Sequence, residues 1–99
     1  MLNFRTEPDG TRLTVALEGR LDTTTAPELE QSLRESVDGV TELVMDFEKL
    51  EYISSAGLRV LLSAQKIMNK QGSMKVIHVG DSILEILEVT GFVDILTIE

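Results

Sequence analysis

Residues 52–59 read Tyr-Ile-Ser-Ser-Ala-Gly-Leu-Arg, and the organisation of the chain follows from this stretch. It comes after the apolar run Leu-Val-Met at residues 43–45, and it opens an amphipathic run. The apolar positions of that run share one helical face: Leu58, Leu61, Leu62 and Met68. The pattern therefore predicts a strand, then a tight turn, then a helix.

The small residues of this turn suit the start of a helix. Ser54 or Ser55 can accept a hydrogen bond from a free amide of the first helical turn and so act as the N-cap. Gly57 has no Cβ, which leaves room for a binding partner to approach the backbone closely. Two interpretations stay open: residues that only start a helix, and residues that also form a contact surface.

Length and composition indicate one globular unit. A chain of 99 residues with 42% hydrophobic residues has the size of one domain, which we expect to span residues 1–99. The net charge of −8 argues against nucleic acid and anionic membranes as partners, because their phosphates would be repelled. The lack of cysteine excludes disulfides and thiolate metal sites. No apolar run approaches the roughly 20 residues that span a bilayer, and residues 1–5 lack a secretory signal. We therefore expect a soluble cytoplasmic protein with a basic or mixed-charge protein partner.

The first half of the chain predicts a hairpin followed by a helix. Alternating apolar residues at 2–6 and 13–17 predict two strands with one buried face each, and turn chemistry at residues 8–10 joins them. The helix should begin at Thr25, which has capping-box spacing to Glu28.

The second half continues the alternation of strands and helices. The apolar run 43–45 predicts an interior strand, and the helix after the serine turn should cover residues 55–69. Residues 75–79 predict another interior strand, and residues 82–85 have capping-box spacing for a last helix. The apolar segment 92–98 should pack back as a tail or short edge strand. This order of elements predicts a compact α/β or α+β fold with parallel crossovers in a mixed sheet.

The polar face of the helix over residues 55–69 carries a cationic stripe. Its members are Arg59, Ser63, Lys66 and Lys70. Spacings of three and four residues place them on one side of the helix, beginning beside the serines. In so acidic a chain we expect this stripe to steer a partner, with an ordinary solvated helix surface as the alternative.

Enzyme chemistry has little support in the sequence. The single histidine, His78, falls in a predicted buried strand, where a satisfied core or edge role is expected. A small hydrolase that pairs Ser55 with His78 would lack the Gly-x-Ser-x-Gly motif. Asp22, Asp46 and Glu48 are expected to cluster at one end of the sheet, but without a histidine they do not define a metal site. We predict no enzyme activity, no metal and no cofactor.

Several of these features are similar to those of a known family. The similarity lies in the order of elements and in the segment Gly19–Asp22 after the second strand. Above all it lies in residues 50–62, which read Leu-Glu-Tyr-Ile-Ser-Ser-Ala-Gly-Leu-Arg-Val-Leu-Leu. The chain resembles a STAS domain of the anti-sigma factor antagonist type over essentially its whole length, including residues 90–92. The resemblance implies an α/β (α+β) fold whose mixed sheet has about four to five strands, flanked by about three to four helices.

The resemblance also implies a regulatory function. In this family a serine or threonine of the turn is phosphorylated by a partner that is both anti-sigma factor and serine kinase. The unphosphorylated chain is expected to bind that partner, which then frees its sigma factor, and phosphorylation should end the binding. Ser55 lies two residues before Gly57, as in the Asp-Ser-Ala-Gly variant of the family, and is the expected acceptor, with Ser54 as second choice. A phosphatase that acts on phospho-Ser55 is a further expected partner, and a monomer or weak dimer is the expected state.

The partner surface implied by the resemblance combines the loop after the second strand, the serine turn and the following helix. Its expected residues are Asp22, Thr23, Ser54, Ser55, Ala56, Gly57, Leu58, Arg59 and Lys66. Two positions depart from the usual family turn, with Ser54 in place of an aspartate and Arg59 in place of a glycine. The alternative function is therefore a STAS scaffold or accessory subunit of a transporter or multiprotein complex, without a phosphorylation switch.

Overall fold

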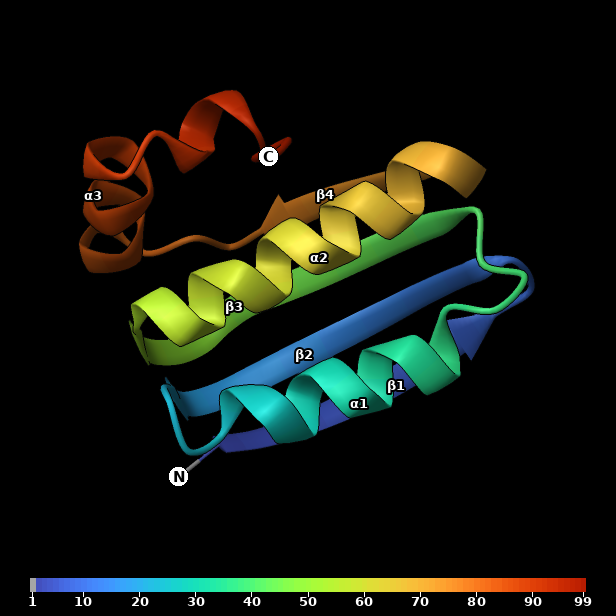
Figure 1. Ribbon diagram of the computed structural model, residues 1–99, viewed down its shortest axis with the longest axis horizontal. Helices are drawn as coiled ribbons and strands as arrows, with labels where there is room; N and C mark the ends of the chain where they lie inside the picture. Colours follow the sequence, from blue (N-terminus) through green and yellow to red (C-terminus); the bar gives the residue numbers. More distant parts are fainter. Residues whose placement is uncertain (1) are drawn as a thin grey trace.

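Strands and helices alternate along residues 2–99, the part of the chain that the computed structural model describes (Figure 1). The strands are β1 Leu2–Asp9, β2 Arg12–Leu21, β3 Glu42–Ile53 and β4 Ser73–Ile77. The helices are α1 Ala26–Ser36, α2 Ser55–Gln71 and α3 Asp81–Val89, followed by the short 3-10 helix η1 Phe92–Asp94. The predicted order of elements and the predicted fold class are confirmed. Met1, which the predicted domain includes, lies outside the described residues.

The described strands form one mixed sheet in the order β1-β2-β3-β4. β1 pairs antiparallel with β2 as the predicted hairpin, whereas β2, β3 and β4 run parallel to one another. Parallel neighbours need crossover connections, and α1 and α2 provide them on the same face of the sheet (Figure 1). The segment 92–98 packs back as predicted, but as η1 and a single parallel bridge of Ile98 with Val76 and not as an edge strand.

β3 is much longer than the apolar run 43–45 that predicted it. Its positions in the hydrophobic core first alternate and then recur at every third residue: Leu43, Met45, Phe47, Leu50 and Ile53. Val44, between the first two, is buried as well but does not belong to this core cluster. This change of spacing is caused by two register shifts against β2, at Ala16–Glu18 and at Gly19–Arg20. At each shift β3 contains one residue more than β2. Because strand prediction depends on a period of two, these bulges hide the second half of β3 from the sequence.

Gly57 lies where the first turn of α2 meets the ends of β2 and β3. It is buried, and a Cβ added there would lie 2.7 Å from Leu21 Cγ and 2.8 Å from Ile53 Cγ1. Only glycine allows the helix backbone to approach the two strands this closely. The prediction that Gly57 leaves room for a partner is wrong, because Leu21 and Ile53 already fill that room.

Neither of the two predicted capping boxes forms. Thr25 has helical backbone angles, φ −99° and ψ −23°, and its hydroxyl turns back toward β2, where it donates to the Arg20 carbonyl at 2.9 Å. The same hydroxyl accepts from the Asp22 amide at 2.8 Å, and it makes no side-chain cap bond to α1. The last helix, α3, begins at Asp81 with Gly80 as N-cap and no side-chain cap, so Ser82 lies inside the helix and too late to cap it.

His78 lies just beyond the end of β4 and not inside a buried strand as predicted. Its φ is 57°, in the left-handed region, and its side chain is 55% exposed. A residue in this conformation cannot continue the extended backbone of a strand, so β4 ends at Ile77. The apolar character of residues 75–79 predicted the strand but gave no sign of where it stops.

We predict that Gly57→Ala lowers the free energy of unfolding by about 1–3 kcal/mol, the usual cost of an extra methyl group in a filled core. Alanine has the higher helix propensity, so a loss can arise only from crowding against Leu21 and Ile53. Gly80→Ala is the matched control, because nothing lies within 4 Å of a Cβ at that position. Urea denaturation measures both variants, and equal stability of the two would contradict the close packing at Gly57.

Candidate functional site

The serine turn, residues 54–57, joins the last residue of β3 to α2. Ser54 is the N-cap of α2, and its Oγ accepts a hydrogen bond from the Gly57 amide at 3.4 Å. Its own amide donates to the Leu21 carbonyl at 2.9 Å, which ties the turn to the end of β2. The prediction of a serine N-cap is confirmed, and the capping residue is Ser54.

Ser55 is the first residue of α2, and it is exposed. Among residues 2–99 its hydroxyl has no hydrogen-bond partner, unlike the hydroxyl of Ser54. At this position the helix presents amides without intrahelical acceptors and the positive end of its dipole. Ser55 therefore combines an accessible hydroxyl with surroundings that favour negative charge.

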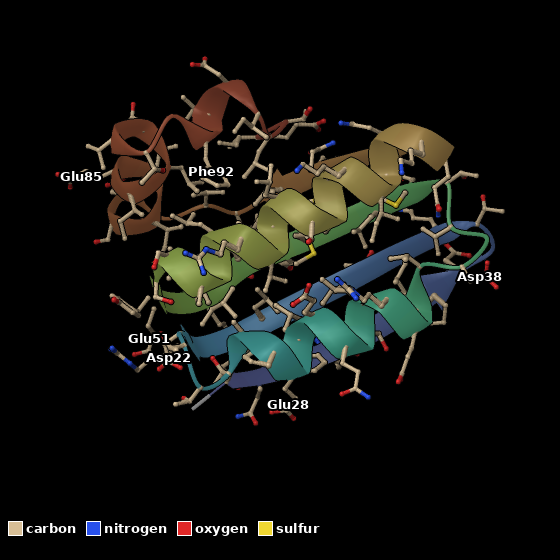
Figure 2. All side chains as sticks on the ribbon, in the orientation of Figure 1. Asp22, Glu28, Asp38, Glu51, Glu85 and Phe92 are labelled. Carbon is tan, nitrogen blue, oxygen red and sulfur yellow. The ribbon has the colours of Figure 1, made fainter. Side chains whose placement is uncertain are left out.

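Asp22 organises the loop between β2 and α1, and Figure 2 shows it at the same end of the molecule as Glu51 of β3. Its Oδ1 accepts hydrogen bonds from the Thr24 hydroxyl at 2.8 Å and from the amides of Thr24 and Thr25 at 3.0 and 3.2 Å. The bond from the Thr24 hydroxyl does most to lower the pKa of Asp22; desolvation opposes it, and the bonds from the Thr25 and Thr24 amides and the Thr25 hydroxyl lower the pKa further. Asp22 is thus ionised at neutral pH and holds its own loop in shape.

The predicted partner residues divide by exposure. Those exposed are Thr23, Ser55, Arg59 and Lys66, and those half-buried are Asp22, Ser54 and Ala56. We name these seven residues the serine-turn surface. Gly57 and Leu58 are buried and pack against the core, which corrects their prediction as surface residues.

Arg20 and Tyr52 adjoin this surface at the ends of β2 and β3, and sequence reasoning missed them as candidate binding residues. The Arg20 guanidinium carbon lies 4.3 Å from the centroid of the Tyr52 ring, a cation–π contact. The ring is 37% exposed, and partly exposed tyrosines are enriched in protein interfaces. The two residues are opposite each other only because of the second register shift between β2 and β3, for which the sequence has no signal.

The structure does not bring Ser55 and His78 together, as the hydrolase alternative requires. His78 is hydrogen-bonded to Asp46, far from the serine turn. The part of β3 from Asp46 to Ile53 separates the two, a length of about 20 Å of extended chain. Ser55 therefore has no histidine base within reach in this structure.

The three acids predicted to cluster do not meet. Asp22 follows the end of β2, where Leu21 pairs with Ile53, whereas Asp46 and Glu48 lie near the middle of β3. The prediction is therefore wrong for Asp22, because the register of the strands separates it from the other two. His78 approaches them instead, with its Nδ1 2.9 Å from Asp46 Oδ1.

The contact between His78 and Asp46 shifts the pKa of both groups. The hydrogen bond to Asp46 and the charge of that carboxylate raise the pKa of His78. For Asp46, desolvation acts to raise the pKa, but the hydrogen bonds from the Glu48 amide and the His78 ring outweigh it and lower the pKa.

Comparison of the chain with known proteins identifies its family. A family model of the STAS domain matches residues 4–99. The chain belongs to the STAS domain family. It is 38% identical to the anti-sigma factor antagonist BtrV of Bordetella bronchiseptica over 85 residues, which cover 84% of this chain and 73% of that protein. It is 30% identical to the anti-sigma-B factor antagonist of Staphylococcus aureus over 97 residues, which cover 96% of this chain and 90% of that protein.

Solved structures of anti-sigma factor antagonists share the fold. An anti-sigma factor antagonist from Mycobacterium paratuberculosis superposes with a TM-score of 0.90 at 25% identity, over 99% of this chain and 85% of that one. The anti-sigma factor antagonist SpoIIAA in its unphosphorylated form gives a TM-score of 0.85 at 16% identity, over 98% of this chain and 88% of that one, a likeness of fold alone. The predicted membership of the anti-sigma factor antagonist family is confirmed. No helix among residues 2–99 is long and apolar enough to cross a membrane.

We predict that Ser54→Ala lowers the free energy of unfolding by about 1 kcal/mol, because α2 loses the side-chain acceptor at its N-cap. Ser55→Ala is the matched control and should change stability by less than about 0.5 kcal/mol, since its hydroxyl has no partner to lose. Urea titration of the two variants measures the difference. Equal losses at both serines would show that Ser54 is not the residue that caps α2.

Proposed function

We propose that the unphosphorylated chain binds an anti-sigma factor with serine kinase activity, which then frees its sigma factor, and that phosphorylation of Ser55 ends this binding. The observation that carries the proposal is the exposed Ser55 hydroxyl, without a partner among residues 2–99, at the start of α2. The relatives named as anti-sigma factor antagonists support the class of partner. Ser54 is the weaker acceptor, because its Oγ is engaged by the Gly57 amide.

A phosphate on Ser55 would alter binding more than folding. It would add a charge of about −1.5 to −2 at neutral pH. The free amides and the dipole at the start of α2 favour negative charge there, so the fold should tolerate it. In a bound complex, the same charge and bulk would have to be desolvated against the partner, which weakens docking. A phosphatase acting on phospho-Ser55 would restore the binding form.

The existence of both phosphorylation states in a protein of the same fold supports a switch of this kind. SpoIIAA has been solved in an unphosphorylated and in a phosphorylated form, with TM-scores of 0.85 and 0.77 to this chain. Both share 16% identity with it, so the likeness concerns the fold. The STAS fold therefore accommodates a phosphorylated form, as the proposal requires of this chain.

The proposed contact area is the serine-turn surface, with Arg59 and Lys66 at its rim. Arg59 lies one helical turn after Ser55, and both cations are exposed on α2. In a chain of net charge −8, these cations would present a local positive area that guides an acidic part of the partner. Asp22 and Thr23 would add contacts from the loop after β2.

We predict that a cognate kinase and ATP place one phosphate on Ser55. Mass spectrometry of the wild-type chain locates the phosphate, and Ser55→Ala should prevent its addition, whereas Ser63→Ala, on the same helix, should not. Ser55→Ala should bind the anti-sigma factor with or without ATP. Ser55→Asp should bind at least about tenfold more weakly, a difference of about 1.4 kcal/mol.

Two results would overturn this proposal in different ways. Phosphate found at Ser54 would move the switch by one residue. A kinase that is active on another substrate but leaves this chain unmodified would favour the scaffold alternative, and capture of transporter components in place of an anti-sigma factor would support it.

We predict that Arg59→Glu slows association with the anti-sigma factor at low salt, because it reverses a charge at the rim of the contact area. Lys49→Glu is the matched control, since it makes the same change in net charge at an exposed position of β3 away from the serine turn. Surface plasmon resonance at two salt concentrations separates the effect on the association rate from that on dissociation. Equal association rates for the two variants would show that Arg59 is ordinary helix surface.

A further inference from the structure

Asp46, Glu48 and His78 come together on the face of the sheet opposite α1 and α2. A carboxylate oxygen from each acid and a ring nitrogen of His78 all lie within 4.8 Å of one another. We propose that these three side chains bind a divalent transition-metal ion and that Zn²⁺ is the ion best matched to them. The site is separate from the serine-turn surface, so it neither supports nor depends on the proposed function.

The two acids reach this position through the geometry of β3. Residues two apart on a strand point to the same face, which places Asp46 and Glu48 together. Asp46 alternates with Met45, which is buried under the helices, so the two acids face the other way. The Glu48 amide donates to Asp46 Oδ1 at 3.0 Å and holds that carboxylate in place.

His78 reaches the same face because β4 ends just before it. Ile77 pairs with Asp46 across the sheet, so a continued strand would place His78 opposite Phe47, on the helix side. Instead, the left-handed φ of 57° ends the strand, and the imidazole turns to Asp46 with 2.9 Å between Nδ1 and Oδ1. The backbone conformation at His78 thus places one nitrogen ligand beside the two carboxylate ligands of Asp46 and Glu48.

An imidazole with two carboxylates is a donor set that suits zinc. Zinc accepts nitrogen and oxygen ligands at about 2.0–2.2 Å, whereas Mg²⁺ and Ca²⁺ prefer oxygen alone. The ion would replace the hydrogen atom shared by His78 Nδ1 and Asp46 Oδ1, and the proton would pass to solvent. The side chain of His78 is 55% exposed, so it can rotate the short distance needed to close around an ion.

A cavity beside the two acids leaves room for the remaining ligands of the metal. It has a volume of about 370 Å³, and Asp46 and Glu48 form part of its wall. Water or a carboxylate from another molecule can therefore complete a four-coordinate site. Arg5 and Lys49 also line the cavity, and their charges oppose a cation, although Arg5 is paired with Glu7 at 3.1 Å.

The test is a titration of the full chain with ZnCl₂, after removal of any histidine tag, by isothermal calorimetry. One Zn²⁺ should bind per chain, and its dissociation constant should rise more than about tenfold in His78→Gln and in Asp46→Asn, since loss of even an outer partner of a metal ligand has effects of that size. Glu51→Gln, an exposed acid of the same strand outside the cluster, should bind as the wild type does. Arg5→Gln should bind more tightly, because it removes a competing charge.

The single histidine of the chain supplies an independent readout. Its ring signals in NMR spectra are unique, and Zn²⁺ should shift them at one equivalent while Mg²⁺ at the same concentration should not. Zinc should also raise the unfolding temperature of the wild type and leave that of His78→Gln unchanged, because only a ligand of the native state stabilises it. Unaltered zinc affinity in His78→Gln with a normal circular dichroism spectrum, or equal binding of Mg²⁺, would overturn the proposal.

Discussion

The structure depends on the contact between Gly57 and the two side chains beneath it, Leu21 and Ile53. Because Gly57 has no side chain, the first turn of α2 lies directly on the ends of β2 and β3. The hydrogen bond from the Ser54 amide to the Leu21 carbonyl, at 2.9 Å, closes the same junction through the backbone. The ends of β2 and β3 and the start of α2 are therefore packed together as one unit.

Core packing, helix capping and the proposed binding involve different residues at the start of α2. Gly57 and Leu58 are directed into the core, Ser54 caps the helix, and Ser55 is left exposed. Because Ser55 is exposed while Gly57 and Leu58 hold the helix start against the core, a change of charge at Ser55 need not disturb the core. Such a change would act mainly on the proposed contact surface, which is the physical requirement for a switch between binding states.

The two faces of the sheet have different chemistry. One face is covered by α1 and α2 (Figure 1). This face forms the hydrophobic core, in which Leu17, Leu43 and Leu61 are almost fully buried. The other face carries charged side chains, including the acids of β3 and the histidine after β4. The register shifts between β2 and β3 add residues to β3 and so change which of its side chains point to each face.

The sequence by itself determined the order of the elements, the N-terminal hairpin, the serine N-cap of α2 and the family. These features follow from local periodicity, turn chemistry and one contiguous motif. All three can be recognised without knowing which strands pair or which residues contact each other in the fold. The tertiary structure alone decided the full length of β3, the burial of Gly57 and the meeting of Asp46 and Glu48 with His78. Each of these depends on the register between strands that are distant in the chain, and the pairing of Asp46 with Ile77 has no signal in the pattern of either segment.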